Sequence, residues 1–279
     1  MTESSSSAEV AVPRGGRNLY AAVAVGIVLA ALTLVTLATQ KWLFAVLAGA
    51  AICIGVWELT QAMKPRGIRA PIVPLLISVP VLTAAAYVWG SEALLAAFGG
   101  AVLVVLVWRL FGPVDGYVRD ATAGMLILGY LPLMLGFAML TLTTEQGPKR
   151  ILVFILLTIA SDIGGYVVGV LIGRHPMAPT LSPKKSWEGF AGSLAFQLVV
   201  GAIAFVVLLD SSVWKGLFAG AVLTVTATLG DFVESGVKRD LGVKDLGSIL
   251  PGHGGLMDRL DSLLPNAFAS WALFTSLLR

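Results

Sequence analysis

The sequence predicts an all-α protein: a polytopic transmembrane helical bundle of about eight or nine spans, with a polar cavity facing the cytoplasm. Three observations lead to this prediction. Hydrophobic residues make up 57% of the 279 residues and charged residues 13%, with a mean hydropathy of +0.89, which is unusual for a water-soluble domain. Apolar runs of spanning length follow one another along the chain. Lysine and arginine gather in alternate connections between those runs.

The chain divides into a short polar start and a long apolar remainder. Residues 1–17 contain serine, glycine and charge without apolar periodicity, so we expect a disordered tail. Residues 18–279 are expected to form one transmembrane domain, with N-terminal helices in 18–150 and the motif-bearing half in 151–279. The first apolar run is long enough to span and lacks a convincing cleavage site, so a signal peptide is disfavoured. Spanning helices are expected at 18–39, 42–63, 72–89, 93–111, 121–142, 151–173, 187–209 and 213–233, with a shorter one at 264–278.

Charge and cysteine content exclude several classes of protein. With the N terminus inside, the inner segments hold 14 of the 19 lysines and arginines, so we place the polar loops in the cytoplasm. The same bias explains the isoelectric point near 9.1, and no nucleic-acid partner is expected. Cys53 is the only cysteine and there are two histidines, which excludes an intramolecular disulfide and a zinc cluster.

Four aspartates mark a candidate metal site. Asp162 lies in "IASDIGG", Asp231 in "TLGDFVES", and Asp258 and Asp261 in "GGLMDRLD". An ionisable residue inside an apolar span is costly and usually functional, although Asp162 could be a structural partner of a base and Asp231 an ordinary helix-end acid. Spacing of three would put Asp258 and Asp261 on one face of a helix. Clustered acids favour a hard cation such as Mg²⁺, and Mg²⁺ suggests a nucleotide or diphosphate partner.

Basic residues near these acids indicate phosphate binding. In "SPKKSWEG", Lys184, Lys185 and Ser186 directly precede a predicted helix, so a phosphate could meet two ammonium groups, a hydroxyl and free N–H groups. The segments "SGVKRD" and "VKD" add the basic residues Lys238, Arg239 and Lys244. Attraction to anionic lipid headgroups is the alternative explanation, but it does not account for the interleaved acids and glycines.

A glycine-rich turn, "PGHGG", completes the polar segment. Gly252, Gly254 and Gly255 allow backbone turns whose successive N–H groups can bind an anion. His253 could donate a hydrogen bond or relay a proton, or it could be a structural hydrogen-bonding residue. Neither a Walker A motif nor a Rossmann fingerprint is present.

The run from Ser235 to Asp261, "SGVKRDLGVKDLGSILPGHGGLMDRLD", closely resembles the signature of the phosphatidate cytidylyltransferase family, also called CDP-diacylglycerol synthases. The resemblance extends back to "SPKKSWEG" and "SDIGGYVVGVLIGRHP", and so covers the chain from about residue 158 onwards. Three departures are modest: Ser186 where threonine is frequent, Gly165 where alanine is usual, and Met177 in a stretch often richer in lysine. The first five helices are assigned to this fold by span count alone.

The resemblance implies a reaction in which CTP and phosphatidic acid give CDP-diacylglycerol and pyrophosphate with Mg²⁺, in a bacterial-type inner membrane. It also suggests a homodimer and a second cation, Mg²⁺ or K⁺. On this basis we expect Asp231 and Asp258 to bind metal, supported by Asp162 and Asp261. Catalytic roles are expected for Asp231, Asp258, Lys238, Arg239 and His253, and substrate binding for Lys184, Lys185, Ser186, Ser235, Lys244, Gly252, Gly254, Gly255 and Arg259.

Three other interpretations remain. A transporter would spread polar groups along the membrane midplane in two related halves, and no convincing internal repeat is found here. A CDP-alcohol phosphotransferase needs an Asp-x-x-Asp-Gly-x-x-Ala-Arg run, whereas "VDGYVRD" at 114–120 lacks the first acid and the Ala-Arg pair. A catalytically silent scaffold is disfavoured because every candidate ligand is present.

Overall fold

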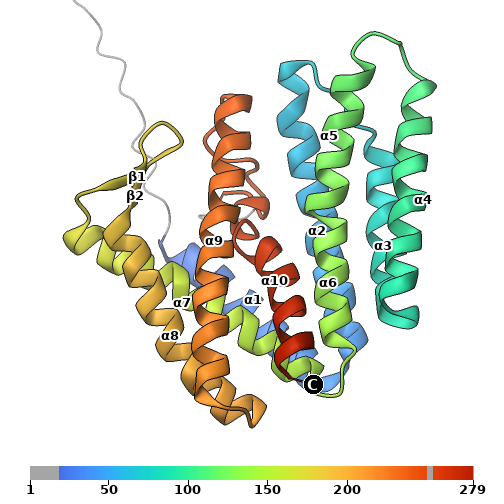
Figure 1. The fold of residues 1–279 in the computed structure, drawn as a ribbon. Helices are drawn as coiled ribbons and strands as arrows, with labels where there is room; N and C mark the ends of the chain where they lie inside the picture. Colours follow the sequence, from blue (N-terminus) through green and yellow to red (C-terminus); the bar gives the residue numbers. More distant parts are fainter. Residues whose placement is uncertain (1–18, 250–253, 279) are drawn as a thin grey trace, which may run out of the picture.

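The computed structural model describes residues 19–249 and 254–278, which form a helical bundle (Figure 1). Each of the nine apolar runs expected from the sequence is helical. The helices are α1 (Leu19–Thr39), α2 (Lys41–Met63), α3 (Ile72–Trp89), α4 (Ser91–Leu110), α5 (Tyr117–Tyr130), α6 (Pro132–Leu142), α7 (Gly147–Ile172), α8 (Trp187–Leu209), α9 (Val213–Leu241) and α10 (Leu263–Leu277), with short 3₁₀ turns η1 (Lys64–Arg66) and η2 (Met257–Arg259). The predicted polytopic all-α fold is therefore confirmed.

Seven helical segments among the described residues are long and apolar enough to cross a membrane. They include α5 and α6 as one continuous span, Tyr117–Leu142, in which the helical pattern is interrupted at Leu131, just before Pro132, which has no N–H to donate. Ala24–Thr39 of α1 is also apolar. The 15 residues of α10 fall below the roughly 20 that a perpendicular span requires.

Glycines let α7, α8 and α9 approach one another closely. A Cβ added to Gly164 of α7 would lie 2.6 Å from the carbonyl oxygen of Gly192 in α8, and one added to Gly201 of α8 would lie 2.5 Å from that of Gly216 in α9. Small residues at such crossings provide backbone contact where lipid offers no hydrophobic driving force. The α7–α8–α9 unit is therefore a tightly packed frame.

Buried polar side chains cross-link this frame. The amide of Gln197, fully buried in α8, donates to the Leu157 carbonyl at 2.7 Å and accepts from the Thr224 hydroxyl at 2.6 Å. Asn266 of α10 donates to the Thr158 hydroxyl at 2.9 Å. Such bonds connect α7 to α8 and α10, and α8 to α9, which gives the lipid-embedded frame a specific geometry.

Helix α10 lies between α9 and α6 (Figure 1) and contacts α6, α7 and α9. Its aromatic residues make these contacts: the rings of Phe268 and Trp271 pack against the ring of Phe137 in α6, with centroid distances of 4.9 and 4.8 Å, respectively. Phe274 packs on Phe205 of α8 at 5.8 Å. This apolar core joins the N-terminal helices to the α7–α9 frame.

The connections that the charge pattern assigns to one side of the membrane are close in space. At the inner end, the Arg66 guanidinium after α2 donates to the Leu241 carbonyl at the end of α9, at 3.0 Å. At the outer end, the Lys41 ammonium donates to the Thr144 carbonyl after α6, at 2.8 Å. These contacts agree with the alternation of loops predicted from the sequence.

A small hairpin interrupts the helices. Strands β1 (Pro176–Ala178) and β2 (Ser182–Ser186) pair antiparallel between α7 and α8. Arg239 of α9 donates to the Leu181 carbonyl in its turn at 3.2 Å. The hairpin, which the sequence analysis did not predict, delivers the lysine pair to the start of α8.

Candidate active site

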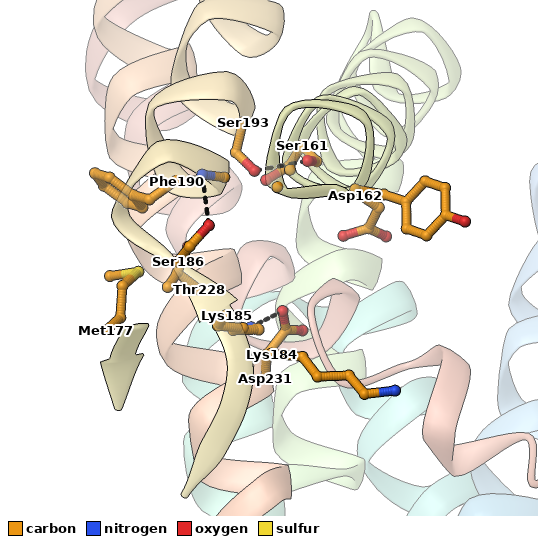
Figure 2. A pocket seen from close by; sticks show the side chains of 14 residues that line it. Ser161, Asp162, Met177, Lys184, Lys185, Ser186, Phe190, Ser193, Thr228 and Asp231 are labelled. Carbon is orange, nitrogen blue, oxygen red and sulfur yellow. Dashed lines mark hydrogen bonds and ion pairs between the residues drawn. The ribbon is translucent and has the colours of Figure 1, made fainter. Parts of the chain in front are cut away.

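A pocket of about 260 Å³ opens between α7, β2, α8 and α9 (Figure 2). Polar residues from three separate segments face it: Ser161 and Asp162 of α7, Lys184, Lys185 and Ser186 of β2, and Thr228 and Asp231 of α9. Asp162 lies ten residues before the end of α7, or about 15 Å along the helix axis. The pocket therefore reaches into the spanning part of α7.

The start of α8 forms one wall of this pocket. Ser186 is the N-cap of α8, and its hydroxyl accepts a hydrogen bond from the Gly189 amide at 3.1 Å. The capping geometry explains why β2 stops here, since the cap residue has extended backbone angles while the next residues turn helical. The positive end of the α8 dipole and the Lys184 and Lys185 ammonium groups provide positive charge in the pocket.

Two carboxylates line the same pocket. The Asp231 carboxylate is ion-paired with the Lys185 ammonium, and Asp162 faces the same space (Figure 2). Asp261 lies beside Asp231, and both Asp231 and Asp162 interact electrostatically with it. Burial, and then the negative charge of Asp231, raise the pKa of Asp261 above its usual range. Three of the four predicted acids are therefore neighbours.

Asp258 has a different environment. Its carboxylate accepts hydrogen bonds from the Lys238 ammonium at 3.1 Å, the Leu246 amide at 3.0 Å and the Gly255 amide at 3.1 Å. Lys238 also pairs with Glu234 at 2.6 Å. The expected common helical face for Asp258 and Asp261 is absent here, because the segment forms the short turn η2 and α10 begins only at Leu263. The two aspartates consequently contact different neighbours.

The remaining predicted site residues surround these two groups. Ser235 lies one helical turn after Asp231 on the same face of α9. Arg259 is close enough to Asp162 for their charges to interact, whereas Lys244 is exposed in the loop after α9. Gly254 has a left-handed φ of 90°, which agrees with a glycine requirement. Arg239 contacts the hairpin as described above; Gly252 and His253 lie outside the described residues.

Sequence reasoning missed two buried acids and a tyrosine. Glu234 is 2% exposed and Glu58, in α2, is 1% exposed. Glu58 in "GVWELT" could have been found, since an acid inside an apolar run is itself a functional signal. The Tyr130 hydroxyl, at the end of α5, donates to the Asp261 carbonyl at 3.2 Å. These residues bring the N-terminal helices into contact with the site.

The donor set fits Mg²⁺ only as a site shared with substrate. Among residues 19–249 and 254–278, no three His, Cys, Asp or Glu side chains converge as a ready-made metal-binding group. Asp231 and Asp261 nevertheless present carboxylate oxygens side by side, near Asp162. Magnesium commonly takes one or two carboxylates from a protein and completes its coordination with water and substrate phosphates. These acids are compatible with such an arrangement.

Fold and site together define an integral membrane protein with a charged pocket beside its spanning helices. The chain belongs to the Cytidylyltransferase family, whose model matches residues 20–277. It is 40% identical to the phosphatidate cytidylyltransferase of Mycobacterium leprae (strain TN) over 281 residues, covering 95% of this chain and 90% of that protein.

Further relatives carry the same name. The protein from Mycobacterium bovis (strain ATCC BAA-935 / AF2122/97) is 39% identical over 277 residues, covering 95% of this chain and 90% of that protein. The protein from Staphylococcus haemolyticus (strain JCSC1435) is 32% identical over 208 residues, covering 74% of this chain and 78% of that protein. Family membership now extends to the first helices, which the sequence motifs did not cover, and favours the enzyme over the transporter and the CDP-alcohol phosphotransferase.

Proposed function

We propose that this protein is a phosphatidate cytidylyltransferase, which transfers CMP from CTP to phosphatidic acid and gives CDP-diacylglycerol and pyrophosphate. One observation carries the proposal: in a chain of the Cytidylyltransferase family, Lys184, Lys185 and the α8 N terminus line one pocket together with Asp162 and Asp231. That pocket opens beside apolar helices. A water-soluble triphosphate and a lipid phosphate can both reach such a position.

The reaction joins two anions. A phosphate oxygen of phosphatidic acid attacks the α-phosphorus of CTP, a new P–O bond forms, and the bond from the α-phosphorus to the bridging oxygen breaks. Pyrophosphate leaves with the electron pair of that bond. Because both reactants are negatively charged, the barrier is mainly electrostatic. Each well-placed donor or cation can lower it by about 3 kcal/mol, roughly a hundredfold in rate.

Basic groups of the pocket supply part of that stabilisation. In the proposal, Lys184 and Lys185 bind phosphate oxygens, and Ser186 orients them at the N–H groups of α8. Ser235, on the same face of α9 as Asp231, adds a hydroxyl, and Arg259 adds a guanidinium near Asp162. Arg239, Lys244, Gly252, Gly254 and Gly255 are assigned to phosphate binding by the family resemblance, and His253 to donating a hydrogen bond.

Acidic residues would hold Mg²⁺. We assign this role to Asp231 and Asp258, with Asp162 and Asp261 in support. Bound Mg²⁺ would neutralise phosphate charge and favour departure of pyrophosphate. Lys238, placed between Glu234 and Asp258, would act by orienting Asp258. A second cation, Mg²⁺ or K⁺, belongs to the same proposal.

Two finer features are also proposed. The excess of lysine and arginine in the inner connections supports a pocket that faces the cytoplasm of a bacterial plasma membrane. A reporter active on only one side, fused within the hairpin at 179–181, should give cytoplasmic signal. A homodimer rests on the family resemblance, and the mass of the detergent-solubilised protein tests it.

The reaction is tested with CTP labelled at two places. Purified protein receives phosphatidic acid, Mg²⁺ and CTP carrying tritium in the cytosine ring and ³²P at the γ-phosphate. We expect tritium in the lipid extract and ³²P in water-soluble pyrophosphate. Phosphorus label in lipid would indicate attack at the γ-phosphorus instead, and absence of both labels from lipid under varied lipid and salt conditions would overturn the proposed function.

A further inference from the structure

Glu58 is a carboxylate with no assigned role, in the middle of the catalytic chain's N-terminal helices. It lies in the apolar helix α2 and is 1% exposed. Burying a carboxylate in such a helix is expensive unless it forms specific interactions. Glu58 lies on the same face of α2 as Gly55, three residues earlier. A Cβ added to Gly55 would lie 3.6 Å from the Met257 sulfur, so this face is close to Met257. This face of α2 therefore packs directly on η2.

The Glu58 carboxylate contacts the loop that precedes η2. Its Oε2 accepts a hydrogen bond from the Met257 amide at 2.8 Å. A Cβ built on Gly247 would lie 2.1 Å from Oε1, and one built on Gly255 would lie 3.0 Å from Oε2. Glu58 thus touches both described arms of the loop, 246–249 and 254–258, and the two glycines are the residues that give it room.

Asp258 holds the same two arms from the other side. It accepts from the Leu246 amide in the first arm and from the Gly255 amide in the second. Gly255 lies between the two acids, since its added Cβ would be 2.7 Å from Asp258 Oδ2 as well as 3.0 Å from Glu58 Oε2. The backbone at 255–257 is therefore clamped between a carboxylate of α2 and the carboxylate of Asp258.

We propose that Glu58 is a positioning residue: its hydrogen bond to the Met257 amide and its fit against Gly247 and Gly255 fix where Asp258 stands. This inference rests on the proposed function for its kinetic consequence, but not for its structural one. It assigns a role to an N-terminal helix in a site otherwise built from residues 158 onwards. Glu58 reaches the chemistry through Asp258 and is not itself a catalytic residue.

The first test compares two changes at the same position. Glu58→Gln keeps an acceptor for the Met257 amide, so turnover should stay within about threefold of the parent. Glu58→Ala removes the acceptor, and because misplacement by about 1 Å costs up to roughly a hundredfold, turnover should fall at least ~10-fold with the KM for CTP nearly unchanged. The matched control is Gln61→Ala, one turn along α2, whose partner is the exposed Lys64. Equal losses in the Gln and Ala variants would overturn the hydrogen-bond role.

A second test uses the glycine opposite Glu58. Gly247→Ala places a methyl group against Glu58 Oε1, so it should lower turnover at least ~10-fold in the parent protein. In the Glu58→Ala background that volume is free, so adding Gly247→Ala should lower turnover less than about threefold further. A double-mutant cycle detects this kind of interaction. Independent, additive losses would contradict a direct clamp.

A third measurement does not depend on activity or metal. Cys53 is the only cysteine, so a Cys53→Ser background accepts a nitroxide at Ser248→Cys in the first loop arm, where Ser248 is exposed. Spin-label mobility should increase in Glu58→Ala and stay at the parent level in Glu58→Gln and Gln61→Ala. If spin-label mobility increases in Glu58→Ala but the parent protein has no enzyme activity, the proposed function is wrong and the role of Glu58 in holding the loop stands. If mobility in Glu58→Ala is unchanged, that role is wrong, whatever the activity.

Discussion

Two lysine–carboxylate groups lie near the pocket, and they differ in their access to it. In the first, Lys185 pairs with Asp231, and these side chains are 28% and 23% exposed. In the second, Lys238 pairs with Glu234 and Asp258, whose side chains are only 1% and 5% exposed. The first group is open to a ligand from the pocket, whereas the second is more buried and also holds the loop through the amides that Asp258 accepts from.

The difference in exposure indicates that the two lysine–carboxylate groups have different tasks. An ion pair open to water contributes little to stability, because solvent screens it, so Lys185 and Asp231 are free to serve binding and chemistry. Removing one partner of a buried pair is costly, because the other charge is left without compensation. The Lys238 group therefore fixes the loop on which Asp258 and the glycines stand.

The largest effect is expected from the open group. Asp231→Asn should lower turnover at least about a hundredfold, since it removes a charge that the transition state requires, with the melting temperature near that of the parent. The labelled-lipid assay and thermal unfolding of the same preparation measure both. Asp210→Asn is the matched control: Asp210 is 78% exposed at the outer end, and asparagine tolerates its left-handed φ of 49°. Equal activity in the two variants would remove Asp231 from the mechanism.

The buried group should dominate stability. Lys238→Met leaves Glu234 and Asp258 without the ammonium that now pairs with both, so we expect a loss of about 3 kcal/mol in the free energy of unfolding. Denaturant unfolding in detergent measures it. If the variant unfolds at the same denaturant concentration as the parent, Lys238 is not needed to hold the loop, and the structural role assigned to the buried group is wrong.

A smaller effect is expected at the helix start that frames the pocket. Ser186→Ala removes the N-cap of α8 and should cost about 1 kcal/mol. Ser186→Thr keeps a capping hydroxyl, the residue frequent in the family, and should retain stability and activity. A thermal-unfolding comparison distinguishes the pair, and identical curves for alanine and threonine would show that the cap is unimportant.

The smallest effect is expected within the α7–α8–α9 frame, at Gln197. Gln197→Leu loses the two bonds that connect α8 to α7 and α9, with an expected cost of about 1 kcal/mol. Thr224 keeps a bond to the Gly220 carbonyl at 2.8 Å, which limits the damage. The control is Gln61→Leu on α2; a loss as large in the control would mean that polar cross-links do not hold the frame.

Much of this arrangement could be predicted from the sequence, because lipid imposes long apolar helices and charge asymmetry. The limits of α8, 187–209, coincide with those expected, and Ser186 directly precedes it as expected, whereas its role as the N-cap was not predicted. The separation of Asp258 from Asp261 could not be predicted, since it depends on η2 being a short turn. Glu58 could have been singled out as an acid in an apolar run, but its role could not be predicted, because it becomes visible only when α2 packs on a loop some 200 residues later in the chain.

The most direct test of the account measures lipid-labelling rate and melting temperature together for Lys185→Met, with Lys238→Met as its counterpart. For Lys185→Met we predict a labelling rate at least ~10-fold lower, because a cation that faces the substrate phosphates is gone, and a melting temperature close to the parent. A parental labelling rate with a strongly lowered melting temperature would contradict the account, because the open pair would then be structural.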